Sequence, residues 1–282
     1  MQEQKNMEYV FRNFFTHKDN LVDAKYIPGT VFTPLSWAFI ASLTVLIVAG
    51  AWWCSNHRAR IRKVFFYNWV FYAVWEVVVI VYDTLGGNTT AFDYAVNLSL
   101  YPCSLYLYMM PIILFSRPDG PWHWMGCAYI CTLGLVGGTI NFVYPIGQLT
   151  EYSCISFVGF HSLFYHGNLL FTFLTLIWSG EWRYTGITKA RYLFMASIPT
   201  ILMSIPANIV NYTVGADYMY FTGRFPLLMI MFPDAPKEMI TLFMYGLYIF
   251  LPPFFFLPSY ISNRLRKRKM MAAITESGLW SC

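Results

Sequence analysis

Long apolar segments, separated by short polar or charged stretches, make up most of the chain. Seven such segments can be marked, with ends defined to ~2 to 4 residues, and they cover residues 31–53, 64–84, 92–115, 123–144, 154–178, 190–211 and 238–260. A helix needs roughly 20 apolar residues to cross a hydrocarbon core about 30 Å thick. The pattern therefore predicts an all-α protein, a polytopic membrane bundle of about seven transmembrane helices.

The composition points the same way. Hydrophobic residues make up 57% of the chain and charged residues only 12%, whereas soluble domains carry roughly a quarter charged residues. The net charge of +5 does not indicate a nucleic-acid partner, because most cations lie in short clusters just beyond apolar segments. We therefore expect an integral multi-pass protein, in the plasma membrane if the chain is bacterial. Its oligomeric state does not follow from the sequence.

The charged loops predict an orientation. Cations follow the first, third, fifth and seventh segments, while the intervening loops carry mainly acidic and polar residues. Since Lys and Arg are retained on the cytoplasmic side, we expect the N-terminus outside and the C-terminus inside. The predicted parts are an extracytoplasmic tail over residues 1–30, with an interfacial helix or a frayed end, a seven-helix domain over 31–262 and a basic cytoplasmic tail over 263–282. The aromatic stretch 211–236 is expected to fold back onto the outer mouth of the bundle.

Three polar residues fall at similar depths in the predicted bundle. Glu76, Cys103 and His166 each lie twelve residues from the cytoplasmic end of their segment. At 1.5 Å per residue this is about 18 Å from the inner face, close to the midplane. An ionisable group in a bilayer is costly and usually faces a partner or a cavity. We therefore expect the three side chains to share one polar layer.

Such a layer would be competent for acyl transfer. A buried thiol is poorly ionised and needs a base to become a nucleophile. His166 would act as that base and later as an acid, and Glu76 would orient the imidazole. Oxyanion donors are also needed, and the sequence does not select among the candidates, which are Asn168, Asn141 and Ser104. This chemistry requires no metal and no cofactor.

Each of these residues also has a structural interpretation. A free cysteine such as Cys103 is most often an apolar filler, and a histidine inside a membrane often bridges two helices by hydrogen bonds. Glu76 is the least easily explained in this way, because a lone carboxylate is expensive at that depth.

Two further pairs do not indicate a metal site. His161 lies five residues from His166, about 140° around a helix, so the two cannot face one metal as an i, i+4 pair would, and we interpret His161 as secondary. Cys127 and Cys131 are one helical turn apart without a second ligand pair nearby. This arrangement indicates core packing.

Several stretches resemble one family, the bacterial YwaF-like integral membrane proteins. The segment that carries Cys103 resembles their third helix, the segment that carries His166 resembles their Phe-x-x-His-Gly helix, and the segment from Asn211 resembles their Asn-x-x-x-Gly-x-Asn-Tyr-Met loop. These stretches are Leu98-Ser99-Leu100-Tyr101-Pro102-Cys103-Ser104, Phe164-Tyr165-His166-Gly167 and Asn211 to Met219, with Asn141-Phe142 ahead of Pro145.

That family is similar to a eukaryotic transmembrane ether-phospholipid acyltransferase, which uses a Cys in an Asn-Pro-Cys stretch and a His. The resemblance implies an acyl thioester on Cys103 with His166 as its partner. It also implies that the partners are membrane lipids and that the acyl donor is a lipid or acyl-CoA. We take Asn141, Asn168, Asn211 and Tyr218 as candidate substrate-binding residues. The alternative is a non-catalytic transporter or lipid-binding protein with a proton-linked Glu/His pocket.

Overall fold

The structure is a computed structural model that describes residues 12–17, 29–86, 98–118, 120–145, 149, 152–182, 191–223 and 230–276. Every regular element in these ranges is a helix, which agrees with the predicted fold class. The elements are α2 (Pro34–Asn56), α3 (Arg58–Gly86), α4 (Leu105–Phe115), α5 (Pro121–Tyr129), the π-helical turn η3 (Ile130–Gly134), α6 (Leu135–Val143), α8 (Phe157–Ser179), α9 (Arg191–Met195), α10 (Ile198–Val214), the 3-10 turn η5 (Tyr218–Tyr220) and α12 (Lys237–Glu276).

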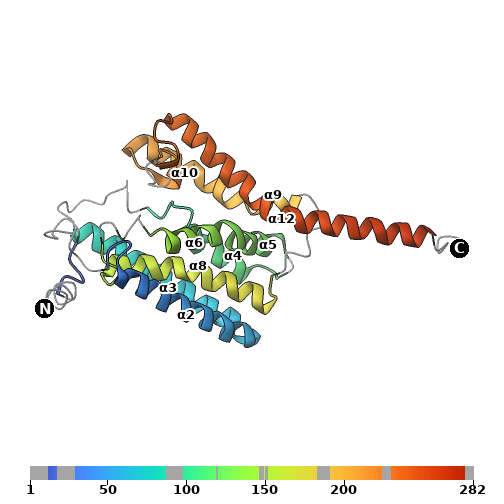
Figure 1. Ribbon diagram of the computed structural model, residues 1–282, viewed down its shortest axis with the longest axis horizontal. Helices are drawn as coiled ribbons and strands as arrows, with labels where there is room; N and C mark the ends of the chain where they lie inside the picture. Colours follow the sequence, from blue (N-terminus) through green and yellow to red (C-terminus); the bar gives the residue numbers. More distant parts are fainter. Residues whose placement is uncertain are drawn as a thin grey trace.

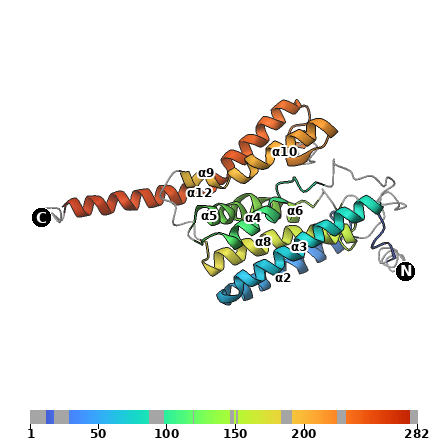
Figure 2. The same cartoon turned by 180° about the vertical axis from the view of Figure 1, so that it is seen from behind.

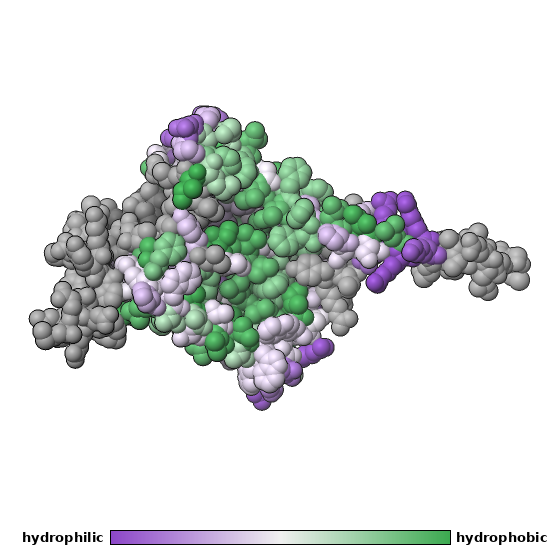
Figure 3. All heavy atoms as spheres, in the orientation of Figure 1, coloured by the Kyte–Doolittle hydropathy of each residue, from purple (hydrophilic) through white to green (hydrophobic). Residues whose placement is uncertain are grey.

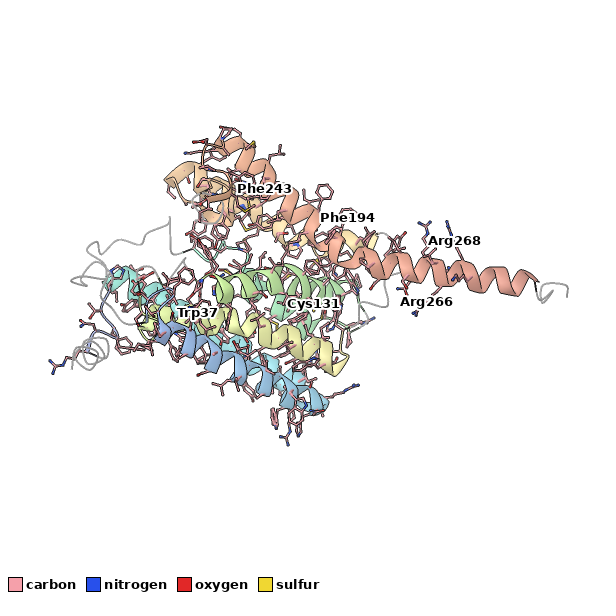
Figure 4. All side chains as sticks on the ribbon, viewed as in Figure 1. Trp37, Cys131, Phe194, Phe243, Arg266 and Arg268 are labelled. Atoms are coloured by element: carbon pink, nitrogen blue, oxygen red, sulfur yellow. The ribbon has the colours of Figure 1, made fainter. Side chains whose placement is uncertain are left out.

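The helices run roughly side by side in three layers. Figures 1 and 2 show α2, α3 and α8 on one side, α4, α5 and α6 in the middle, and α9, α10 and α12 on the other side. The main hydrophobic core lies between these layers, with Tyr106, Tyr129 and Ile130 fully buried. Cys127 and Cys131 are also fully buried in it, which confirms their predicted role in core packing (Figure 4).

The outer surface of the bundle is strongly apolar. Val45 and Leu46 on α2, Val77 on α3 and Phe254 on α12 are each more than half exposed, and Figure 3 shows hydrophobic residues spread over the main body. Soluble monomers rarely expose apolar patches of this extent. The surface is therefore suited to contact with lipid acyl chains.

Five helical stretches of the described chain are long and apolar enough to cross a membrane. They are Pro34–Asn56, Arg58–Gly86, Pro121–Phe142, Tyr192–Val214 and Lys237–Lys269. α8 has 23 residues but carries two histidines and an asparagine and falls outside this set, while α4 has only 11 residues. A multi-pass membrane protein is thus supported, and the number of seven spans and their orientation stay predictions.

The third predicted span differs from a continuous helix. Within the described part of residues 92–115, helix begins only at Leu105, and residues 98–104 form bends and turns. Pro102 has no N–H to donate and disfavours helical geometry at the residue before it. Its carbonyl accepts hydrogen bonds from the Tyr129 hydroxyl and from the Leu105 N–H, the latter at 3.3 Å. Cys103 therefore lies just ahead of a short helix and not in the middle of a long one.

The last helix is longer than its apolar segment. The predicted span covers 238–260, and α12 extends beyond it as one helix of 40 residues that continues through the basic positions of the predicted tail. Figure 1 shows its C-terminal part projecting beyond the bundle, and Figure 4 places Arg266 and Arg268 on that part. Hydrophilic residues gather where α12 leaves the main body (Figure 3).

A small part of the predicted N-terminal tail is described. The Phe157 N–H donates to the carbonyl of Phe14 at 2.9 Å, and the ring centroids of Phe15 and Phe157 are 5.4 Å apart. His17 Nε2 lies 3.5 Å from Asp83 Oδ1. Residues 12–17 thus contact the adjacent ends of α8 and α3. Most of the remaining tail lies outside the described residues.

Candidate functional site

Glu76 on α3 has two partners inside the bundle. Its Oε1 accepts a hydrogen bond of 2.8 Å from the Ser99 hydroxyl. Its Oε2 lies 3.4 Å from His161 Nε2 on α8, a close polar contact without the alignment of a hydrogen bond. The Glu76 and His161 side chains are 19% and 10% exposed. The carboxylate thus has the neighbouring groups that an ionisable side chain in a membrane requires.

The described contacts correct the predicted pairing of Glu76 with His166. The carboxylate contacts His161, which we had interpreted as secondary, and His166 lies about 140° further around α8. A Cβ added to Gly138 on α6 would lie 3.1 Å from the His166 carbonyl oxygen, so α6 packs closely against this turn of α8. The two histidines therefore occupy different faces of the same helix.

His166 carries an imidazole nitrogen that is free to act as a base. Its Nδ1 lies 2.8 Å from the carbonyl oxygen of Ser162, to which only an N–H can donate. In the neutral ring this leaves the lone pair on Nε2. Nε2 is buried and has no hydrogen-bond partner among the described groups. This is the tautomer that a general base needs.

Cys103 differs from the other described cysteines. Cys54, Cys127, Cys131 and Cys154 are buried, whereas Cys103 is only partly buried. Its thiol lies against the backbone N–H and the hydroxyl of Ser104, at the start of α4. The N-terminal end of a helix favours a negative charge. The Cys103 thiol is therefore placed at the N-terminal end of α4.

The structure brings Cys103 and Glu76 into one neighbourhood. The two groups are close enough to interact electrostatically. Several tyrosines from other elements also lie within electrostatic range of the sulfur, namely Tyr129, Tyr165, Tyr220 and Tyr248. No hydrogen bond among the described groups joins Cys103 to His166. The common layer of Glu76, Cys103 and His166, and the pairing of Cys103 with His166, stay predictions.

The irregular segment that carries Cys103 is tied to three other elements. Its Leu98 N–H donates to the Tyr218 hydroxyl at 2.8 Å, Ser99 donates to Glu76, and the Pro102 carbonyl accepts from Tyr129. Non-helical backbone at membrane depth occurs where it is buried in protein or lines a cavity. These ties fix the position of the thiol relative to α3 and η5.

Asn211 and Tyr218 hold the loop that follows α10. Asn211 Nδ2 donates to the Tyr218 carbonyl at 2.9 Å, and the Tyr218 N–H donates to Asn211 Oδ1 at 2.8 Å. Gly215, with a φ of +71°, ends α10 between them. The Tyr218 ring lies 5.0 Å from that of Tyr101. This part of the 211–236 stretch therefore folds back onto the Cys103 segment, and both residues position the loop.

The two other predicted substrate-binding residues are placed differently. Asn141 donates to the Gly137 carbonyl of its own helix at 3.1 Å. Asn168 is buried, and neither its Nδ2 nor its Oδ1 has a hydrogen-bond partner among the described groups. It lies beside the Tyr106 hydroxyl, which donates to Asn68 Oδ1 at 2.5 Å. Asn168 thus faces a polar interior between α3, α4 and α8.

This polar interior follows a regular stripe on α8. His161, Tyr165, Asn168 and Thr172 are all buried and are spaced by four, three and four residues, which places them on one helical face. The Tyr165 hydroxyl and the Thr172 hydroxyl also have no hydrogen-bond partner among the described groups. The spacing is visible in the sequence, but we did not use it to predict the site.

A contrast between two buried asparagines tests this assignment. Asn168→Leu is expected to change the stability of the purified protein by less than about 1 kcal/mol, because the Asn168 amide has only a poorly aligned contact with the Tyr106 hydroxyl to lose. Asn211→Leu is expected to lower stability by about 1–3 kcal/mol, because it breaks two hydrogen bonds to Tyr218. Thermal unfolding in the same detergent measures both. Equal destabilisation by the two substitutions would show that the Asn168 amide is fully paired.

A thiol–imidazole contact that the sequence analysis did not predict lies on α5. Cys127 Sγ lies 3.5 Å from His123 Nε2, and His123 Nδ1 lies 3.0 Å from the Ile113 carbonyl oxygen. The i, i+4 spacing of the pair was the available signal. Because Cys127 is fully buried, this pair serves here as a control for Cys103. Within the described ranges, no cluster of three or more His, Cys, Asp or Glu side chains is arranged to hold a metal ion.

Comparison with known proteins gives one match. The family model described as the TMEM164 family matches residues 31–261, a range that contains Glu76, Cys103, His161 and His166. No curated protein and no solved structure matches the chain.

Proposed function

Because the chain belongs to the TMEM164 family of transmembrane proteins, we propose that it is an intramembrane lipid acyltransferase in which Cys103 carries the acyl group. The observation that carries the proposal is the setting of Cys103. It is the one described cysteine that is only partly buried, it lies just ahead of a helix, and it shares its neighbourhood with Glu76. The resemblance to the YwaF-like proteins and to the ether-phospholipid acyltransferase points to the same residue.

In the first half-reaction, the Cys103 sulfur attacks the carbonyl carbon of the acyl donor. His166 accepts the thiol proton on Nε2, the C–S bond forms, and the bond from the carbonyl carbon to the donor's leaving oxygen or sulfur breaks. The leaving group takes the proton from His166. The donor is a phospholipid or acyl-CoA.

In the second half-reaction, a hydroxyl of a lysophospholipid attacks the thioester. His166 accepts the hydroxyl proton, the new ester C–O bond forms, and the C–S bond breaks to release the sulfur, which regains a proton. Glu76 contributes by position, because it holds Ser99 of the Cys103 segment. The apolar surfaces of the surrounding helices suit acyl chains on both substrates.

Trapping of the thioester tests the proposal. The full-length protein in mixed micelles is incubated with a phospholipid bearing an alkynyl acyl chain, quenched in acid and analysed by intact and peptide mass spectrometry. We expect a hydroxylamine-sensitive acyl adduct on Cys103 that is absent in Cys103→Ser. Cys127→Ser, which removes a buried thiol next to a histidine, should retain the adduct. An adduct that persists in Cys103→Ser would contradict the proposal.

One observation favours a second candidate function, a non-catalytic lipid-binding or transport protein with a proton-linked pocket. The Glu76 and His161 pair can exchange a proton without any covalent chemistry. The two functions differ in which residue is essential. Function that survives Cys103→Ala but not Glu76→Gln would favour this candidate over acyl transfer.

A further inference from the structure

A groove lies at the basic end of α3, away from Cys103. It has a volume of about 450 Å³ and lies between the start of α3 and the end of α4. Its lining residues are Ala59, Arg62, Lys63, Phe66, Tyr67, Leu114 and Phe115. The groove thus combines two cations with three aromatic rings, and neither the family nor the proposed acyl transfer assigns it a role.

The positive charge at this end is not balanced by acidic groups. Arg58, Arg60, Arg62 and Lys63 lie within the first six residues of α3, where the helix itself contributes positive potential. None of the four forms an ion pair with an acidic side chain among the described residues. The Arg62 guanidinium donates to the Leu114 carbonyl and keeps further N–H groups for a ligand. The groove is therefore suited to an anion.

The apolar side of the groove indicates what kind of anion fits. Tyr67 and Phe115 are each 69% exposed, and the ring centroids of Phe66 and Phe115 are 6.5 Å apart. Beyond them, α3 presents the exposed side chains of Phe71 and Val74. A ligand whose charged group lies at Arg62 and Lys63 would have apolar surface on the side of the aromatic rings and charged residues on the opposite side.

The position along the helix matches that of a lipid. On α3 the sequence changes from charged to apolar between Lys63 and Val64. This is the boundary at which phospholipid headgroups meet the hydrocarbon core. A soluble phosphate compound would use the cations but not the exposed aromatic rings below them.

We propose that this groove binds one anionic phospholipid, with its phosphate on Arg62 and Lys63 and an acyl chain along Phe66 and Phe115. The site is separate from the Cys103 neighbourhood, and the inference goes beyond the proposed acyl transfer. The proposed lipid site does not depend on which side of the membrane the start of α3 faces.

Native mass spectrometry of the full-length protein tests the proposal. The protein in neutral detergent is titrated with dioleoyl phosphatidylglycerol or, as the neutral probe, dioleoyl phosphatidylcholine. We expect one preferred phosphatidylglycerol adduct in the wild type. The double variant R62Q/K63Q should bind it roughly 30-fold more weakly, as expected for two cations at a membrane surface. R58Q/R60Q removes the same charge outside the groove and should bind nearly as well as the wild type.

Equal weakening in both double variants would overturn the proposal, since it would show attraction by diffuse surface charge. No weakening in R62Q/K63Q would also overturn it. Because Arg62 also holds the Leu114 carbonyl, Ala59→Trp provides a variant that fills the groove and keeps every charge. It should lose the preferred adduct, and wild-type binding by Ala59→Trp would overturn the proposal. If micromolar inorganic pyrophosphate displaces the lipid, the proposal is overturned, and the groove binds a soluble phosphate compound instead.

Discussion

Replacing His166 by asparagine is expected to slow acyl transfer by about 10²- to 10⁴-fold, the usual contribution of a general base, with little change in Tm. The substitution removes the free Nε2 lone pair but leaves an amide that can donate to the Ser162 carbonyl. Asparagines in this chain already donate to the carbonyl four residues earlier, as Asn56, Asn141 and Asn208 show. The local structure of α8 should therefore survive.

The matched control is His161→Asn, which removes the partner of Glu76. We expect it to lower stability by about 1 kcal/mol at most, because it removes a polar neighbour of the carboxylate that is not an aligned hydrogen-bond partner. Single-turnover acyl transfer and thermal unfolding are measured for both variants, with the pH dependence of the rate. If His166→Asn loses stability and activity in parallel, as a helix-bridging residue would, the general-base role is wrong.

The hydrophobic pattern predicted most of the helices within a few residues, and its two failures have identifiable causes. Hydropathy reports which residues tolerate lipid and does not report backbone conformation. It therefore missed the break before Leu105, which depends on Pro102, and it ended the last helix too early. Residues 264–273 consist only of Arg, Lys, Leu, Met and Ala, which are good helix formers, so α12 continues after its apolar segment ends.

Counting residues along the sequence gives a predicted depth in the membrane, but it gives no direction around a helix. Counting residues placed Glu76, Cys103 and His166 at one depth, and the structure supports a common neighbourhood for the first two. Packing between helices determines which face of α8 meets α3. In the structure this face carries His161, which therefore contacts Glu76. The polar stripe on α8 was the available clue, because four buried polar residues at helical spacing must face a common partner.

The largest effect on folding is expected from a single methyl group at Gly159, in the first turn of α8. A Cβ there would lie 2.1 Å from the backbone oxygen of Ser153 and 2.9 Å from its carbonyl carbon. Both are backbone atoms and cannot rotate away. Ser156, which caps α8, accepts from the Gly159 N–H at 3.2 Å and donates to the same Ser153 oxygen at 2.7 Å. Relief of the clash therefore requires movement of the cap itself.

Gly159→Ala is accordingly expected to destabilise the protein by about 2–4 kcal/mol, the sum of overpacking and a lost helix cap. Thermal unfolding of the purified protein measures it, with Gly137→Ala on α6 as the control. A Cβ at Gly137 meets nothing within 4 Å, so alanine there should be neutral or stabilising by up to about 1 kcal/mol. Since His161 follows Gly159 by two residues, Gly159→Ala should also disturb the contact between α8 and Glu76. Equal Tm values for the two variants would show that the start of α8 adapts freely, and the Glu76 to His161 contact would then not be fixed by this turn.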